Sequence, residues 1–294
     1  MKAFFITTQS GEMPQYVESF TSLGFQAERF AFNHHKDSPG TAQEYEPIIW
    51  DQVSEYQPDL IVYVGACESN TPSPQFLRRL RDKAPTVHLC PDAGDHPWWP
   101  EIMAFDEALS FDVQVAMDGS PWPLENTQIT GLMAFNPDRY HPIPHENRPV
   151  LFGFAGDIGG PREELLNKLK TFGLQCRNRD NDNYEKVANY ICNCRMVPNI
   201  GRTGSFDRMH VKWRVMESGL SEALLLEMKG SPTSKWFIPG VDYMEWETPQ
   251  EAGAIVQFYR DKPEETQVFG KRLRKKVLEN HSPQKFWGRV FEKL

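Results

Sequence analysis

The chain has 294 residues, enough for one large domain or for two domains of about 150 residues each. Its composition, 39% hydrophobic and 24% charged, excludes wholesale disorder, and no apolar run approaches the roughly 18–20 residues that a membrane-spanning helix needs. The net charge of −8 is uneven, because residues 1–149 carry 21 acidic and 9 basic residues whereas residues 150–294 carry 19 and 23. The acidic half disfavours a broad nucleic-acid surface, and the basic half suits a phosphorylated ligand.

The first half alternates short β-like apolar runs with helical patterns. KAFFITT at 2–8 predicts a strand instead of a signal peptide, because no small-residue cleavage pattern follows it, and we therefore expect a cytoplasmic protein. The β-branched run DLIVYVG at 59–65 is typical of a buried parallel strand. Strands alternating with helices indicate right-handed βαβ units in an open parallel sheet. Further strands are predicted at 25–32, 85–90, 112–117 and 127–132, and helices at 13–24, 43–57 and 73–84.

A proline-rich polar stretch at 136–149 interrupts this pattern and indicates an interdomain linker. We place the linker at 141–149, between a domain 1–140 and a domain 150–280, and expect the C-terminal helix 281–294 to cross back to the first domain. Two α/β halves of this kind place a cleft at the carboxyl ends of their strands. After a strand at 150–156 and a helix at 161–173, weaker units follow at 174–176, 184–194 and 195–199, then apolar runs at 211–219, 222–227 and 235–240, and helices at 248–260, 263–280 and 283–294.

The stretch FAGDIGGPREELL at 154–166 places three glycines between a strand and a helix. Glycine lets the backbone approach a phosphate closely, and the amides of a helix N-terminus supply donors. The stretch matches neither G-x-G-x-x-G nor the P-loop pattern, which disfavours a Rossmann dehydrogenase or a P-loop NTPase. A phosphate or sugar contact and a simple chain reversal both fit it.

The segment GRTGSFDRMHVKWRVMESG at 201–219 is the most informative stretch. Lys212 and Arg214 precede Glu217 on one predicted helix, so that all three lie near one helix end. Two cations there would neutralise a diphosphate, and a carboxylate would accept both hydroxyls of a ribose. From spacing alone, a surface Arg–Glu ion pair is the alternative interpretation.

This segment and those that follow it resemble the C-terminal domain of CgeB-like (spore-maturation type) glycosyltransferases. That family shows a Lys-x-Arg-x-x-Glu helix start, a strand, a Pro-Gly-x-Asp-Tyr turn and a terminal helix preceded by histidine, which match VKWRVMESG, ALLLE, FIPGVDYMEW and HSPQKFWGRVFEKL here. PTVHLCPDAGDHPWW and LMAFNPDRYHP resemble motifs of its first half. The resemblance covers most of residues 58–294 in the right order.

The resemblance implies a GT-B fold, in which two Rossmann-like doubly wound domains face a central cleft, and a nucleotide-sugar donor site in the C-terminal domain. Lys212 and Arg214 would compensate the diphosphate charge, and Glu217 would hold the ribose. Better-known retaining GT-B enzymes carry two glutamates separated by seven residues, whereas nine separate Glu217 from Glu227 here, so the stereochemistry stays open. The other implied donor-site residues are Gly156 and Gly160 in the close turn, Arg162 as a phosphate contact, and Gly240, Asp242 and Tyr243 at the far side of the pocket.

The acidic loop CPDAGDHPWWP at 90–100 follows a predicted strand and offers Asp92, Asp95 and His96 as candidate catalytic bases for an acceptor hydroxyl. Trp98 and Trp99 would stack on a sugar face or a base. The alternative is a loop whose aspartates form turns and whose tryptophans only pack. Two weaker acceptor-side candidates are Gly11, in the first βα turn, and His34, for which a solvated loop is the alternative.

The sequence therefore predicts a glycosyltransferase, hexosyl- or pentosyl-, that moves a sugar from a UDP- or GDP-linked donor to a hydroxyl acceptor without a metal or other cofactor. The acceptor, a saccharide, a protein or modified DNA, stays open. Two alternatives remain, namely a phage-type DNA glycosyltransferase acting on hydroxymethylated bases and a non-catalytic sugar-nucleotide-binding protein. No metal site is expected, because the five cysteines form no C-x-x-C pair and Asp180 and Asp182 lie in a polar loop.

Overall fold

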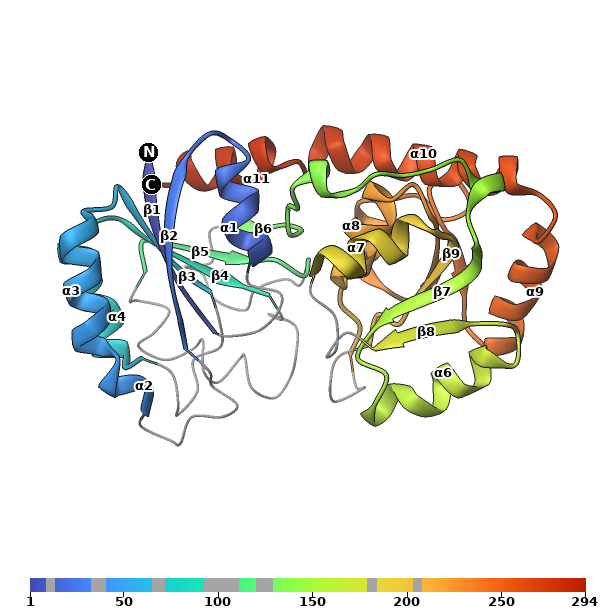
Figure 1. Cartoon of the computed structure of the whole chain (residues 1–294), viewed down its shortest axis with the longest axis horizontal. Coiled ribbons are helices and arrows are strands. Elements are labelled where there is room, and N and C mark those ends of the chain that lie inside the picture. Colours follow the sequence, from blue (N-terminus) through green and yellow to red (C-terminus); the bar gives the residue numbers. More distant parts are fainter. Residues whose placement is uncertain are drawn as a thin grey trace. The chain divides into compact units, whose positions relative to one another are not determined.

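The computed structural model describes residues 1–8, 14–32, 41–64, 72–91, 111–119, 129–178, 184–202 and 208–294. The chain divides into two compact units, one formed by residues 1–134 together with 283–294 and the other by residues 135–282. Each unit is an α/β structure built on its own parallel sheet (Figure 1). Among the described residues, no helix has the length and apolarity that a bilayer crossing requires.

The first unit holds a six-stranded parallel sheet in the order β2-β1-β3-β4-β5-β6. Its central strands are buried along their whole length, which explains the continuous apolar runs that predicted them. The strands are β1 (Lys2–Thr8), β2 (Gln26–Phe32), β3 (Leu60–Val64), β4 (Thr86–Cys90), β5 (Val113–Ala116) and β6 (Ile129–Thr130). The predicted strands are therefore confirmed, although β6 is shorter than expected.

The helices of the first unit cover both faces of this sheet, as right-handed crossovers require (Figure 1). They are α1 (Pro14–Thr21), α2 (Thr41–Glu44), α3 (Glu46–Tyr56), α4 (Pro74–Arg79) and α11 (Pro283–Phe291). The C-terminal helix α11 joins this unit, in agreement with its predicted return. Trp287 on α11 donates to Ser19 Oγ at 3.1 Å and packs edge-on against Phe5 and Phe20.

The second unit holds a five-stranded parallel sheet in the order β11-β10-β9-β7-β8. The strands are β7 (Val150–Gly156), β8 (Gln175–Asn178), β9 (Cys194–Asn199), β10 (Leu224–Met228) and β11 (Met244–Trp246). The apolar run 235–240 forms no strand, because the chain turns at Gly240, where φ is +72°, and Asp242 Oδ2 accepts a hydrogen bond from the Ile238 amide. The last strand follows this turn instead.

The chain leaves β7 toward β8 on one side and returns to β9 on the other, so β7 and β9 form the topological switch point. Helices α6 and α9 contact each other, as do α7 and α8, and α10 contacts α8 and β10. The helices are α6 (Glu163–Lys170), α7 (Tyr184–Cys192), α8 (Trp213–Leu220), α9 (Pro249–Tyr259) and α10 (Pro263–Asn280).

The segment 141–149, predicted as a linker, is hydrogen-bonded into the second unit. Arg148 is 5% exposed and donates to the carbonyls of Ile143, Cys194 and Ser221 at 2.7–2.8 Å. His145, also buried, lies 2.7 Å from the Glu222 carbonyl and 2.7 Å from Thr266 Oγ1. Burial, with the charge of Arg148 nearby, lowers the pKa of His145 to about 3. A neutral imidazole therefore connects this segment to the turn after α8 and to α10.

Helix α10 approaches the same turn so closely that only glycine fits at position 270. A Cβ on Gly270 would lie 1.9 Å from the backbone oxygen of Glu222, whose own φ is +55°. We expect Gly270→Ala to destabilise the second unit by about 1–3 kcal/mol or more, because a backbone atom must move. Thermal unfolding followed by circular dichroism measures this as a lower Tm.

The matched control is Gly288→Ala on α11, where a Cβ meets no atom within 4 Å. This substitution should leave the stability unchanged or raise it by roughly 0.5–1 kcal/mol, because alanine is the better helix former. Equal transitions for the Gly270→Ala and Gly288→Ala proteins would contradict the close packing at α10.

Candidate functional site

Several buried polar residues of this unit, among them Asn199, Arg214 and Glu227, lie at the carboxyl edge of its sheet. In open α/β sheets, ligands bind outside the carboxyl ends of the strands at the switch point. Here β7 ends at Gly156 and β9 at Asn199, the two strands on either side of that point. Helix α8 follows β9 along the chain, and its first turn carries the predicted cations. We therefore take this edge as the candidate ligand site.

The turn after β7 has the geometry that its glycines predict. Gly160 has a φ of +60°, a conformation that L side chains rarely adopt, and it starts a short 3-10 turn that ends at Arg162. Asp157 Oδ1 accepts a hydrogen bond from the Gly159 amide at 2.9 Å, which closes the turn locally. Arg162 is half-buried and lies at the N-terminal end of α6.

Arg214, in the first turn of α8, is the central residue of this edge. Its side chain is 7% exposed, and its guanidinium donates to the carbonyl of Ala155 at the end of β7. The guanidinium carbon lies 5.6 Å from the centre of the Phe154 ring. A Cβ on Gly156 would come within 3.4 Å of Nη2 and within 2.9 Å of the Phe154 ring, so the glycine leaves room for the guanidinium.

Glu217, one turn further along α8, pairs with this guanidinium. Its Oε2 lies 2.8 Å from Arg214 Nη1, and both side chains are nearly inaccessible. The predicted Arg–Glu pair therefore exists, but it is buried and not on the surface. Nε of Arg214 is buried without a hydrogen-bond partner among the described residues. An unsatisfied donor of this kind costs free energy unless a ligand or water completes it.

Lys212 occupies the N-cap position of α8 and is half-buried. Its side chain makes no capping hydrogen bond, and the Val215 amide of the first turn donates to the Lys212 carbonyl at 3.1 Å. The N-terminus of a helix carries partial positive charge that favours an anion. The structure thus brings Gly156, Arg214 and Glu217 together, and Lys212 lies two positions before Arg214 in the chain. This is a cationic helix start beside a glycine turn, the arrangement that binds phosphates.

A layer of aromatic residues supports the start of α8. The hydroxyls of Tyr140 and Tyr184 are hydrogen-bonded, and Tyr140 is 2% exposed. Burial raises the pKa of Tyr140 well above its usual value, and the nearby Tyr184 and Glu217 raise it further. Phe135 stacks on Tyr184 and meets Trp213 edge-on, with both pairs of ring centres 6.0 Å apart. Sequence patterns alone did not indicate a role for these residues in the site.

Glu227, near the end of β10, is a second buried carboxyl, and no sequence motif places it in the site. It is fully buried and accepts hydrogen bonds from Asn199 Nδ2 at 2.8 and 3.1 Å, from Thr233 Oγ1 at 3.1 Å and from the Met228 amide at 3.1 Å. A Cβ on Gly201 would lie 3.1 Å from Oε1. Glu227 therefore connects the chain after β9 to the 3-10 turn after β10.

The other predicted donor-site residues form the turn before β11. Asp242 is 1% exposed, and its Oδ2 lies 2.5 Å from Lys276 Nζ in addition to its bond with the Ile238 amide. Tyr243 is fully buried, donates to Glu245 Oε1 at 3.3 Å and has a pKa raised chiefly by burial. Gly240 provides the positive φ of the turn. These contacts stabilise the turn, and the Asp242–Lys276 ion pair connects it to α10.

The candidate catalytic and acceptor-side residues lie outside the described part of the chain. They are Asp92, Asp95 and His96 as catalytic candidates, and Gly11, His34, Trp98 and Trp99 as acceptor-side candidates. Asp180 and Asp182 are also outside it. Among the residues that the structure describes, no group of three or more His, Cys, Asp or Glu could hold a metal ion.

Comparison with known proteins supports a sugar-transferring protein. Residues 148–291 match the sequence profile of a family described as glycosyl transferase-like. Comparison with curated protein sequences finds no match.

The whole chain is similar in fold to several solved structures. HepE of Anabaena, in complex with UDP-glucose, is 12% identical with a TM-score of 0.63, and the match covers 99% of this chain and 98% of that one. Sucrose-phosphate synthase from Thermosynechococcus elongatus is 10% identical with a TM-score of 0.68, over 100% and 98% of the two chains. UDP-GlcNAc 2-epimerase from Neisseria meningitidis, bound to UDP-GlcNAc, is 9% identical with a TM-score of 0.57, over the full length of both chains.

At these identities the likeness establishes the fold, which is the predicted GT-B type with two Rossmann-like α/β units. The family match and this fold together support a GT-B glycosyltransferase. An epimerase shares the fold, so the fold alone does not define the reaction.

The Glu227 cluster makes the stability of the second unit depend on pH. Burial raises the pKa of Glu227 from 4.5 to about 8, against the lowering effect of the hydrogen bonds that it accepts. Between these values the folded protein holds a proton that the unfolded chain releases, so the contribution of Glu227 to stability falls as the pH rises. The slope for one such group is about 1.4 kcal/mol per pH unit.

Urea unfolding of the wild type and of Glu227→Gln between pH 5 and pH 8 tests this directly. The variant cannot titrate at this position, so we expect its stability to decline less steeply with rising pH. Glu264→Gln, on the exposed start of α10, is the control for the loss of one carboxyl. Parallel pH profiles for the wild type and Glu227→Gln would contradict the raised pKa.

Proposed function

We propose that the protein transfers a glycosyl group from a nucleotide-sugar to an acceptor hydroxyl, as a CgeB-like glycosyltransferase. The observation that carries the proposal is the buried Arg214–Glu217 pair at the start of α8, in contact with the glycine end of β7. This pair lies at the switch point of the second sheet, within the segment that matches the glycosyl transferase-like family.

The diphosphate of the donor is assigned to the start of α8. The first-turn amides of the helix, the ammonium group of Lys212 and the unsatisfied Nε of Arg214 provide positive charge and donors for its oxygens. Arg214 engages one carboxylate oxygen of Glu217, and we assign the ribose hydroxyls to the other. Gly156 and Gly160 keep the turn after β7 open to the sugar phosphate, because neither carries a side chain that would fill it.

Uridine diphosphate sugars are the first donors to test. HepE of Anabaena was solved with UDP-glucose and the Neisseria meningitidis epimerase with UDP-GlcNAc. These proteins share the fold of the present chain, so we propose a uridine nucleotide for the site at the start of α8. GDP-linked sugars are the second set of donors to test. The transferred sugar in this proposal is a hexose or a pentose.

In the proposed reaction, the bond between the anomeric carbon and the phosphate oxygen breaks, and the diphosphate leaves with the bonding electrons. Lys212 and Arg214 stabilise the negative charge that develops on it, without a metal ion. The acceptor oxygen forms the new bond to the anomeric carbon, and its proton passes to a general base. Asp92, Asp95 and His96 are the candidates for that base from the sequence.

Donor binding to the purified protein tests the site. Titration with UDP, monitored by calorimetry, should show binding to the wild type that Lys212→Ala and Glu217→Gln each weaken about tenfold or more, since each substitution removes a charge-assisted contact. Lys168→Ala and Glu164→Gln change an exposed ion pair on α6 and are the matched controls.

Circular dichroism is needed for Glu217→Gln, because the substitution leaves a buried guanidinium without its carboxylate. Lys212→Ala avoids this problem, since Lys212 is only half-buried. The proposal is wrong if neither UDP- nor GDP-sugars bind the wild type, or if Lys212→Ala binds them as tightly as the controls do.

Metal removal tests whether protein side chains, and not a metal ion, compensate the negative charge of the leaving diphosphate. We expect sugar transfer to a hydroxyl acceptor to continue in excess EDTA, because the proposal places the compensating charge on Lys212 and Arg214. The measurement is the release of the nucleoside diphosphate together with the appearance of labelled sugar on the acceptor. This readout also separates transfer from an isomerisation of the sugar. Loss of activity in EDTA and its recovery with Mg²⁺ would refute the metal-independent scheme.

A further inference from the structure

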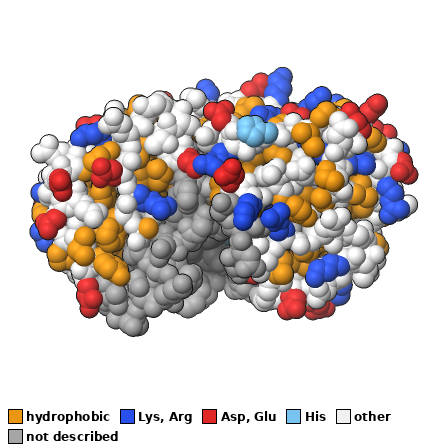
Figure 2. Space-filling model, in the orientation of Figure 1, with side chains coloured by type: hydrophobic (Ala, Val, Ile, Leu, Met, Phe, Trp, Pro, Cys, Tyr) orange, Lys and Arg blue, Asp and Glu red, His pale blue; other side chains and the backbone are white. Residues whose placement is uncertain are grey.

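Glu227 differs from the carboxylates at the molecular surface. Figure 2 shows acidic side chains on the visible face of the molecule, where water solvates their charge. Glu227 is instead 0% exposed, and it accepts from the Asn199 side chain at 2.8 and 3.1 Å, from the Thr233 hydroxyl at 3.1 Å and from the Met228 amide at 3.1 Å. An apolar side chain would fill the position without the cost of burying a polar group, so stability alone does not account for the carboxyl.

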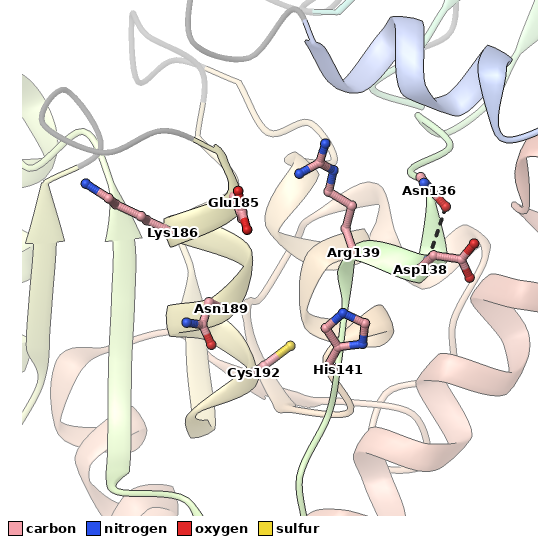
Figure 3. A pocket seen from close by; sticks show the side chains of 8 residues that line it. All are labelled: Asn136, Asp138, Arg139, His141, Glu185, Lys186, Asn189 and Cys192. Atoms are coloured by element: carbon pink, nitrogen blue, oxygen red, sulfur yellow. Dashed lines mark hydrogen bonds between the residues drawn. The ribbon is translucent and has the colours of Figure 1, made fainter.

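The cavity in the same unit is a separate feature. It has a volume of about 690 Å³ and lies between the segment 136–141 and α7, with Arg139 and Glu185 among its described lining residues (Figure 3). Neither Glu227 nor its hydrogen-bond partners are among those residues. Glu227 is fully buried, so any effect that it has on a ligand passes through the residues that it contacts.

The chain between β9 and α8 packs against this carboxyl. Its residues 201–202 pair with residues 209–210, which we call the hairpin base. The carbonyl of Gly201 accepts from the His210 amide at 2.8 Å, and Arg202 forms an antiparallel bridge with Met209. A Cβ on Gly201 would lie 3.1 Å from Glu227 Oε1 and 3.3 Å from the His210 carbonyl oxygen. The hairpin base therefore passes directly over the Glu227 carboxyl.

The hairpin base leads straight into the start of α8. His210 and Val211 are 1% and 2% exposed, and Lys212 follows them as the N-cap residue. Two closely packed residues thus precede Lys212, so a shift of the backbone at His210 is passed on to Lys212. Asn199, at the end of β9, is held by Glu227 as well. Glu227 therefore fixes the chain on both sides of the point where it leaves the sheet for α8.

We propose that Glu227 is a positioning residue for donor binding, which holds the hairpin base and thereby places Lys212 at the start of α8. The inference rests on the proposed function, in which Lys212 binds the donor diphosphate. It adds a residue that acts without touching the donor. A displacement of about 1 Å in a binding group is enough to lower activity or affinity many-fold, so the support beneath Lys212 matters as much as its charge.

Substitutions on either side of the contact test the inference in the full-length protein. Glu227→Ala removes the carboxyl, and we expect it to weaken UDP binding in calorimetry about tenfold. Gly201→Ala forces the hairpin base away from Glu227 and should weaken UDP binding at least about threefold. Glu227→Gln keeps the size of the side chain and one acceptor oxygen, so it should recover most of the affinity that Glu227→Ala loses. Glu247→Ala, at an exposed carboxylate paired with Lys229, is the matched control and should bind UDP as the wild type does.

A double-mutant cycle with Lys212→Ala separates positioning from a general loss of stability. When Glu227→Ala is added to Lys212→Ala, UDP binding should weaken less than about twofold, because the group that Glu227 positions is already absent. A tenfold loss in both backgrounds would mean that the effect does not pass through Lys212, and would overturn the inference. Gly201→Ala replaces Glu227→Ala in the cycle if the latter does not fold.

Backbone hydrogen exchange without nucleotide supplies a readout that does not depend on the proposed function. Residues 208–214 should exchange faster in Glu227→Ala than in the wild type or Glu247→Ala, because the hairpin base loses its support. The inference is overturned if this exchange is unchanged, or if Lys212→Ala weakens UDP binding while Glu227→Ala and Gly201→Ala do not. The latter result leaves the proposed function in place. Faster exchange in a protein that binds neither UDP nor any nucleotide-sugar would refute the proposed function and reduce Glu227 to a structural contact.

Discussion

The guanidinium of Arg214 is the element on which the candidate site depends. It is held between the carbonyl that ends β7 and the carboxylate of Glu217, with the Phe154 ring beside it. Burying a charged pair costs desolvation free energy that a well-packed apolar pair would avoid, so such a pair is weak evidence for stability. Its position at the switch point of the sheet, and the absence of a hydrogen-bond partner for its Nε among the described residues, support instead the proposed role as a ligand contact.

Buried polar groups are unevenly distributed in the second unit. The strand interiors are apolar, with Phe152, Leu224 and Leu226 fully buried between the sheet and the helices that cover it. The carboxyl edge instead holds Glu227 with Asn199, and the start of α8 rests on the hydroxyl pair of Tyr140 and Tyr184. Buried polar groups must be hydrogen-bonded, and networks of this kind hold their members in one geometry. A site that recognises a polar donor needs such an edge, since its contacts have to be in place before the ligand arrives.

The helices and strands, and the grouping of Lys212 and Arg214 with Glu217, could be predicted from the sequence because each has a local sequence pattern. Buried parallel strands appear as short β-branched runs, and Thr248 with Glu251 forms a capping box in the structure. Lys212, Arg214 and Glu217 share one helix start, so their proximity follows from helix geometry alone. No element is assigned to the apolar run 235–240 from the sequence, because a run beside Pro239 and Gly240 does not reveal which side of the turn pairs with β10.

The amino-acid sequence by itself determined the alternation of strands and helices, the division into two α/β halves and the candidate donor residues, since periodicity and short motifs are properties of neighbouring positions. Only the tertiary structure decided that the Arg214–Glu217 pair is buried, that Glu227 meets Asn199 and Thr233, and that the segment 136–141 faces α7 across a polar cavity. These contacts join residues far apart in the chain, and the burial that alters their charges exists only when the sheet and its helices have packed. The spacing of residues along the chain does not predict that packing.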